Sequence, residues 1–347
     1  VTPERIVQLA KNTGMTAYRT GFFDAFSLAL GGAFWAYMGW YATTFVAGEV
    51  KEANKKLPMI LLVAGLAVMI VYLLASSLSA IACMNVASDG QWSFYQAYAW
   101  LSYPPKAAED AVAAAVATIP NFQSAWSTGI ASMIARGMDL GWLSWLIALG
   151  GVLWVANDIP PFLLVASRTF FAMSFDRMLP EKFAYVSEKW HAPVWSIIIT
   201  AVFAIPACMA EANFPKGAAT YLAFAGVVGT DIFDAFFLTL FCLSCMLLPL
   251  ERRDIYERAA VKHSVGTVCT LGFFATLGAA FCLYIFIKES SWIWSLFTSG
   301  ADIGEVVSAI GFFGCIIVGI LLYVYYMYRN TTRGIDMRTL YLNIPPE

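Results

Sequence analysis

Three acidic residues lie well inside long apolar stretches of the sequence, where a charged side chain is costly. Asp158 lies in one stretch, and Asp231 and Asp234 lie together in another, where their spacing puts both on one face of a helix. No Lys or Arg lies deep in these stretches, so each carboxyl must be protonated, hydrated or paired with a group outside the sequence. Acids of this kind can bind cations or carry protons. The structural alternative for each is a protonated Asp that hydrogen-bonds a neighbouring helix.

A second feature is the run of glycines and aromatic residues at 30–41, LGGAFWAYMGWY. Gly31, Gly32 and Gly39 weaken a helix at a depth where hydrocarbon favours an unbroken one. A break there can persist only if the released backbone groups face a cavity or a ligand. Transporters use unwound backbone and half-helix ends of this kind to bind charged groups of their substrates. A glycine-lined packing face is the alternative interpretation.

The composition places these features in a membrane protein. Of the 347 residues, 60% are hydrophobic and only 13% are charged, whereas about 25% are charged in an ordinary globular protein. This balance excludes a soluble enzyme and a disordered chain. With 21 Lys and Arg against 23 Asp and Glu, there is also no basic excess for binding nucleic acid.

Cysteine and histidine usage does not favour catalysis or a cofactor. The 7 Cys are scattered singly apart from Cys242 and Cys245, and no His lies near them at ligand spacing. They are typical of small core residues rather than of a disulfide framework or a metal site. His191 and His263 fall near the ends of apolar stretches. We therefore expect neither an enzyme nor a bound cofactor.

Seven stretches exclude charge over the roughly 20 residues that a helical span requires. We therefore predict an all-α polytopic membrane protein with seven transmembrane helices. An outer segment, residues 1–21, precedes the first span, and residues 329–347 form a tail after the last. The predicted spans are 22–48, 58–83, 140–172, 193–210, 219–249, 264–287 and 305–328.

The connection at 85–138 is much longer than the others. It contains a proline break near Pro104 and an alanine-rich run that begins at Ala107. Because Glu109, Asp110 and Arg136 lie within it, we predict a pair of amphipathic helices on the outer face rather than an eighth span. This loop could act as a lid, and a passive surface cover is the alternative.

The basic residues predict the orientation. Most Lys and Arg fall in one set of loops, which the positive-inside rule places in the cytoplasm. With seven spans, Val1 is then outside and the tail is cytoplasmic. No signal peptide is recognisable before Arg5, and an outside start requires earlier spans. We expect an odd number of helices upstream, so that the sequence is the rear part of a longer polypeptide. The alternative is a seven-span protein whose short N-terminus crosses the membrane unaided.

Several motifs resemble those of amino acid permeases of the amino acid-polyamine-organocation (APC) superfamily. The run FWAYMGW at 34–40, followed by GEVK at 48–51 and KKLP at 55–58, is similar to the sixth helix of that family and the loop after it. The run SRTFFAMSFDRMLP at 167–180 resembles the end of its eighth helix.

Two further motifs extend the resemblance in the same order. Ala192 and Pro193 open the next span, and LPLERRD at 248–254 is similar to the loop after the tenth helix. The resemblance runs from about residue 15 to residue 328, as helices six to twelve of a twelve-helix transporter. It implies a LeuT-like fold, of which this sequence holds the second inverted repeat plus two trailing helices. Five missing N-terminal helices would place Val1 outside, in agreement with the basic residues.

The resemblance also implies a substrate site. In the family, the broken sixth helix presents backbone carbonyls to the substrate amino group, and an aromatic residue closes over it. Gly39 would permit the break, and Ser167 and Thr169 lie near the hydroxyls that bind sodium in sodium-coupled relatives. The eighth and tenth helices contribute further positions. The candidate substrate-binding residues are Phe34, Trp35, Ala36, Tyr37, Met38, Gly39, Trp40, Phe162 and Thr230.

The favoured function is a secondary active transporter of amino acids or related organic cations, which works by alternating access in the cell membrane. Asp158, Asp231 and Asp234 would attract a cationic substrate or carry protons, so H+ and Na+ coupling both stay open. The expected partners are the substrate, membrane lipid and the missing helices, with no nucleic acid. The alternatives are a non-transporting membrane scaffold and a proton-relaying subunit of a membrane complex.

Overall fold

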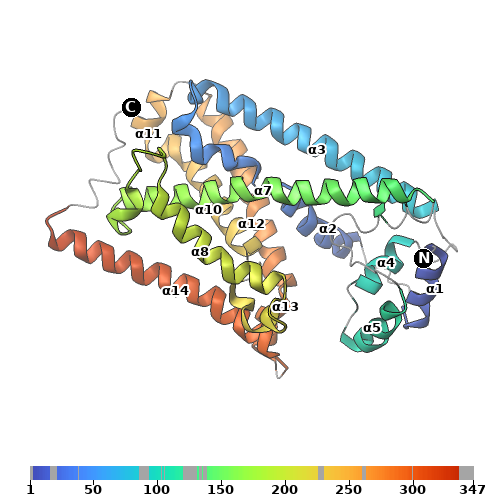
Figure 1. Cartoon of the computed structure of the whole chain (residues 1–347). Coiled ribbons are helices and arrows are strands. Elements are labelled where there is room, and N and C mark those ends of the chain that lie inside the picture. The colour runs from blue at the N-terminus through green and yellow to red at the C-terminus, as the bar shows by residue number, and fades with distance from the viewer. Residues whose placement is uncertain are drawn as a thin grey trace. The chain divides into compact units, whose positions relative to one another are not determined.

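The computed structural model is helical, and the residues that it describes contain no strand (Figure 1). The chain divides into two compact units. One comprises Val1–Ala25 with Val63–Pro160, and the other comprises Phe26–Leu62 with Pro161–Glu347. The described residues are 3–15, 22–37, 39–85, 94–102, 104, 106–119, 131–132, 135, 139–225, 230–259, 263–298 and 300–335.

Among the residues that the structure describes, five helices are long and apolar enough to cross a membrane. In hydrocarbon a continuous helix satisfies its own backbone groups, which is why these apolar runs form long helices. Two shorter apolar helices, α2 (Phe22–Tyr37) and α8 (Val194–Glu211), lie in the other two stretches predicted as spans. The five long helices are α3 (Ala53–Asn85), α7 (Gly141–Phe175), α10 (Thr230–Glu251), α12 (Val265–Glu289) and α14 (Ile303–Thr332).

The stretch predicted as one span at 219–249 is not one continuous α-helix. It begins with the short α9 (Ala218–Tyr221) and the 3-10 turn η4 (Ala223–Ala225), and the long α10 starts only at Thr230. Hydropathy alone does not detect this change because the whole stretch is apolar. Gly226 and Gly229, which lie outside the described residues, have low helix propensity.

The unit that contains the N-terminus has a small buried core of its own. Helix α1 (Pro3–Asn12) packs against α4 (Phe94–Ser102), and α5 (Glu109–Ala117) adds Val112 to the same core. The Trp100 side chain donates a hydrogen bond from Nε1 to Thr13 Oγ1 at 3.1 Å. The buried side chains of this cluster are Ile6, Val7, Ala10, Met15, Phe94, Ala97, Tyr98, Leu101, Val112 and Ile119.

In the other unit, α10 and α12 pack side by side along their lengths (Figure 1). They approach closely at Gly272, where an added Cβ would lie 2.7 Å from Met246 Cβ and 2.9 Å from Met246 Cα. Helix α14 packs against α9, η4 and the short α13 (Ser291–Ser295).

The far end of α14 is joined to the turn that follows α7. Asn330 is buried and donates a hydrogen bond from Nδ2 to the Arg177 carbonyl at 2.9 Å. Met178 and Tyr326 are buried against each other beside this bond. Within the turn, Ser174 Oγ donates to the Pro180 carbonyl at 2.6 Å. The 3-10 turn η3 (Glu181–Ala184) and the helix α11 (Arg253–Arg258) lie in the remaining connections.

Candidate functional site

The first predicted span changes its backbone conformation at Gly39. Helix α2 ends at Tyr37, and a 3-10 helix, η1, runs from Trp40 to Glu49. Between them Gly39 has φ 87°, a left-handed conformation that glycine adopts without steric cost. Gly31 and Gly32 lie within α2, so the described helix continues through that pair and ends beside the third glycine.

The end of α2 supplies the backbone groups that a ligand could use. An α-helix leaves the carbonyls of its last turn without intrahelical donors, and it carries partial negative charge there. The last turn of α2 contains Phe34, Trp35 and Ala36. Such carbonyls can accept hydrogen bonds from an ammonium group. The side chains of Trp35, Ala36 and Trp40, and the whole of Met38, lie outside what the structure describes.

Aromatic contacts join both sides of this break to neighbouring helices. Before the break, the half-buried Phe34 packs edge-to-face on Phe286 of α12, with 4.9 Å between ring centroids. After it, the Tyr41 ring lies 6.4 Å from the Phe237 ring of α10. The residues around the break therefore lie against α10 and α12 within one compact unit.

The two acids of α10 lie at the same end of that helix. Asp231 and Asp234 are half-buried and interact electrostatically with each other. Asp231 Oδ1 is inaccessible to solvent and has no hydrogen-bond partner among the described residues. Asp234 interacts electrostatically with the Tyr41 hydroxyl. Thr230, the first residue of α10, is half-buried beside them.

Tyr41 is a residue of this group that the sequence alone did not single out. It follows Trp40, immediately after the predicted break, and interacts electrostatically with Asp234. The available signal was its position in the sequence, on the far side of Gly39 from Phe34. Because the interaction joins segments nearly two hundred residues apart, the spacing of residues within one segment does not predict it.

Four of the predicted residues lie on α7. Asp158 belongs to the unit with Val63–Pro160, and the Phe162 side chain is 58% exposed. Ser167 is buried and donates from Oγ to the Leu164 carbonyl at 3.0 Å, while the exposed Thr169 donates from Oγ1 to the carbonyl of Val165 at 2.9 Å. Both hydroxyls therefore donate to carbonyls of their own helix. Their oxygen atoms keep lone pairs, which are what a cation would bind.

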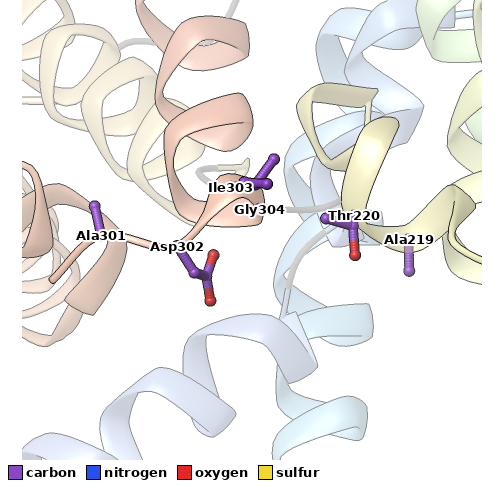
Figure 2. A pocket seen from close by; sticks show the side chains of 6 residues that line it. All are labelled: Ala219, Thr220, Ala301, Asp302, Ile303 and Gly304. Atoms are coloured by element: carbon purple, nitrogen blue, oxygen red, sulfur yellow. The ribbon is translucent and has the colours of Figure 1, made fainter.

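A pocket of about 600 Å³ lies elsewhere in the same unit, between α9 and the start of α14. Figure 2 shows Thr220 and Asp302 on its opposite sides. Asp302 is the N-cap of α14: its Oδ1 accepts from Glu305 N at 2.8 Å, and Glu305 Oε2 accepts from Asp302 N at 3.1 Å. These carboxylates therefore stabilise the helix start. No predicted site residue lines the pocket.

Membrane-length helices, together with a helix that ends within an apolar stretch and acids on a neighbouring helix, are typical of multi-pass membrane transport proteins. The chain matches the model of the amino acid permease family over residues 4–335. It therefore belongs to that family, and so to the APC superfamily of permeases. No curated protein and no solved structure shows significant similarity to it. Family membership makes it a transporter and does not favour a scaffold or a proton-relaying subunit.

Proposed function

We propose that the chain takes part in secondary active transport of amino acids or related organic cations across the cell membrane, by alternating access. The observation that carries this proposal is the break at Gly39, whose flanking residues pack against α10 and α12. A backbone break in an apolar stretch is stable when a ligand or a cavity satisfies the released groups. The proposed orientation, with Val1 outside and the tail cytoplasmic, rests on the distribution of basic residues.

The proposed site binds the substrate ammonium group at the end of α2. The carbonyls of its last turn accept the ammonium hydrogens, and the helix dipole favours positive charge at this position. Phe34, before the break, and Trp40, after it, belong to the proposed site by their positions in the sequence, and Tyr37, the last residue of α2, adds a ring. Phe162 and Thr230 complete the site in this proposal, each from a separate helix.

The acids favour a substrate with a second positive charge, or a coupled proton. A carboxylate attracts a cationic side chain such as that of lysine, and the bond is stronger than one between neutral groups. Asp231 Oδ1 is buried without a donor among the described residues, and a protonated carboxyl costs less to bury than a carboxylate. We therefore favour H+ over Na+ as the coupled ion. Asp158 is a further candidate proton carrier.

Sodium coupling would use different atoms. Ser167 and Thr169 could each supply one hydroxyl oxygen as a ligand. A sodium site needs several oxygen ligands in one place. The two couplings therefore predict different residues whose substitution abolishes the ion dependence.

Uptake into proteoliposomes tests the proposal. Lysine, putrescine and alanine are offered to the reconstituted protein under an imposed pH gradient, an imposed sodium gradient or neither. We expect accumulation of the cationic substrates when the outside is acidic, with little effect of sodium. Accumulation of alanine alone would contradict the role of the acids. No uptake and no binding of any of the three would refute the proposed function.

A further inference from the structure

Gly311 of α14 lies directly against the backbone of Phe224, in the η4 turn that precedes α10. A Cβ added at Gly311 would lie 2.6 Å from Phe224 Cβ and 2.7 Å from both its Cα and its carbonyl oxygen. Atoms this close must move apart, and rotation of the Phe224 side chain cannot relieve a contact with its backbone. Only glycine therefore permits this approach of α14 to η4.

The next residue of α14 contacts α10 itself. The Phe312 ring lies 4.5 Å from the Phe233 ring, centroid to centroid, and 5.3 Å from the Trp292 ring. Phe233 lies between Asp231 and Asp234 in the sequence of α10. Helix α14 thus contacts both the turn that precedes α10 and the part of α10 that carries the acids.

Buried neighbours make this region resistant to independent movement. Ile232 and Ala235 are buried on α10 and form one apolar cluster with Phe286 of α12, against which Phe34 and Phe312 pack. Close-packed groups transmit a displacement instead of absorbing it. A shift of Phe224 or Phe233 would therefore change the position of the α10 acids relative to Phe34.

We infer that Gly311 and Phe312 are positioning residues, which hold the start of α10 at the distance from the α2 break that the substrate site requires. The inference rests on the proposed function, because it assigns the acids and the break to one site. Neither residue touches the substrate. They act through Phe224 and Phe233, so α14 sets the substrate affinity although it supplies no ligand.

Gly314 provides a matched control on the same helix. A Cβ added there would meet no atom within 4 Å. Gly311→Ala and Gly314→Ala add the same methyl group and the same gain in helix propensity to α14. The difference between the two variants therefore isolates the contact with Phe224.

The first measurement is the apparent KM and the maximal rate of uptake in proteoliposomes. We expect Gly311→Ala to raise the apparent KM about tenfold, as the typical cost of overpacking predicts. Gly314→Ala should stay within about twofold of the unsubstituted protein on the same scale. A purely structural role would lower the amount of folded protein and leave the KM of the remainder unchanged. An unchanged KM in folded Gly311→Ala protein overturns the inference.

The second measurement does not depend on transport. Spin labels replace the exposed Phe236 of α10 and Tyr284 of α12 in a background without native cysteines. Gly311→Ala should shift the distance between the labels, and Gly314→Ala should not. If the unsubstituted protein transports nothing, the proposed function fails while this distance still tests the positioning. An unshifted distance in Gly311→Ala refutes it.

Phe312→Leu is a second variant, which tests the same role of α14 if Gly311→Ala does not fold. It keeps the glycine contact, removes the ring from Phe233 and conserves most of the side-chain volume. Loss of one aromatic pair predicts a rise in apparent KM of about threefold, with protein abundance maintained. A normal KM in this variant, together with an unshifted label distance, overturns the role of α14.

Discussion

The cluster of α1, α4 and α5 and the bundle of α10, α12 and α14 are stabilised in different ways. In the cluster, Ile6, Ala97 and Tyr98 have no exposed surface, as in the core of a soluble protein. In the bundle many large apolar side chains are exposed, such as Phe236 at 52% and Phe274 at 63%. Lipid covers such side chains as well as protein does, so apolar burial adds little to helix association there.

The difference indicates which residues to examine in each region. A cluster surrounded by water depends on large buried side chains, because removing their apolar surface from water drives folding, and the α1, α4 and α5 cluster has such side chains. A membrane bundle depends on small residues that let backbones approach and on specific aromatic contacts. Gly272 and Gly311 serve that purpose here.

The largest expected effect is the loss of a large side chain from the cluster. Tyr98→Ala should destabilise the α1, α4 and α5 cluster by about 3–5 kcal/mol, since a fully buried aromatic side chain leaves a cavity. Limited proteolysis of the segment 94–119 measures it. Tyr95→Ala, at a residue of α4 that is 53% exposed, is the control. Equal protease resistance of the two variants would mean that the cluster is not a folded core.

The next effect concerns the break in α2. Gly39→Leu should weaken substrate binding by more than about a hundredfold, because a bulky residue at φ 87° is strained and would favour a different backbone. Equilibrium binding of radiolabelled lysine to purified protein measures this. Gly48→Leu, at a glycine of η1 without positive φ, is the control. Binding that survives within twofold would favour the packing-face interpretation.

A smaller effect is expected where α12 crosses α10. Gly272→Ala should destabilise the bundle by about 1–3 kcal/mol, because its Cβ would meet the backbone of Met246. Gly278→Ala, on the same helix with no atom within 4 Å, should be neutral or slightly stabilising. Thermal melting in detergent compares the two. If both variants melted together, close backbone approach would not be what holds this pair of helices.

Asp231, whose Oδ1 accepts no hydrogen bond from the described residues, should affect proton coupling more than folding. Asp231→Asn keeps the shape of the side chain and removes its ability to exchange a proton. We expect the pH dependence of uptake to flatten, with protein abundance within about twofold of the unsubstituted protein. The measurement is the uptake rate at a series of pH values, normalised to the amount of protein in the vesicles. A fall in abundance with an unchanged pH profile would assign the residue a structural role.

The smallest effect belongs to an exposed pair outside the bundle. The Arg252 guanidinium donates to both Asp254 carboxylate oxygens at 3.2 Å and lowers the pKa of Asp254. A lowered pKa contributes stability above the ordinary carboxyl pKa of about 4, and that stability is lost as the pH falls through the lowered value. The Asp254→Asn variant should therefore have a slightly lower melting temperature than the unsubstituted protein at neutral pH. In acid the two melting temperatures should be equal. High salt should reduce the difference.

Local sequence features predicted the parts of the site that depend on one segment. The glycine at 39 between aromatic residues predicted a break because helix propensity and membrane depth conflict there, and Asp231 and Asp234 stood out because acids are rare at that depth. The electrostatic interaction of Tyr41 with Asp234 and the packing of α1 on α4 join distant segments. The spacing of residues within one segment does not encode such pairs, so they could not be predicted from the sequence alone.

The hydrogen bond between Asn330 and the Arg177 carbonyl restricts which bodies can move. If the end of α7 tilted away from α14, the Asn330 amide and the Arg177 carbonyl would lose their hydrogen bond. The same movement would expose Met178 and Tyr326, which are buried against each other. A cycle that avoids this cost keeps the two helix ends together. Helix α14 would then move together with the end of α7 instead of staying fixed while α7 moves.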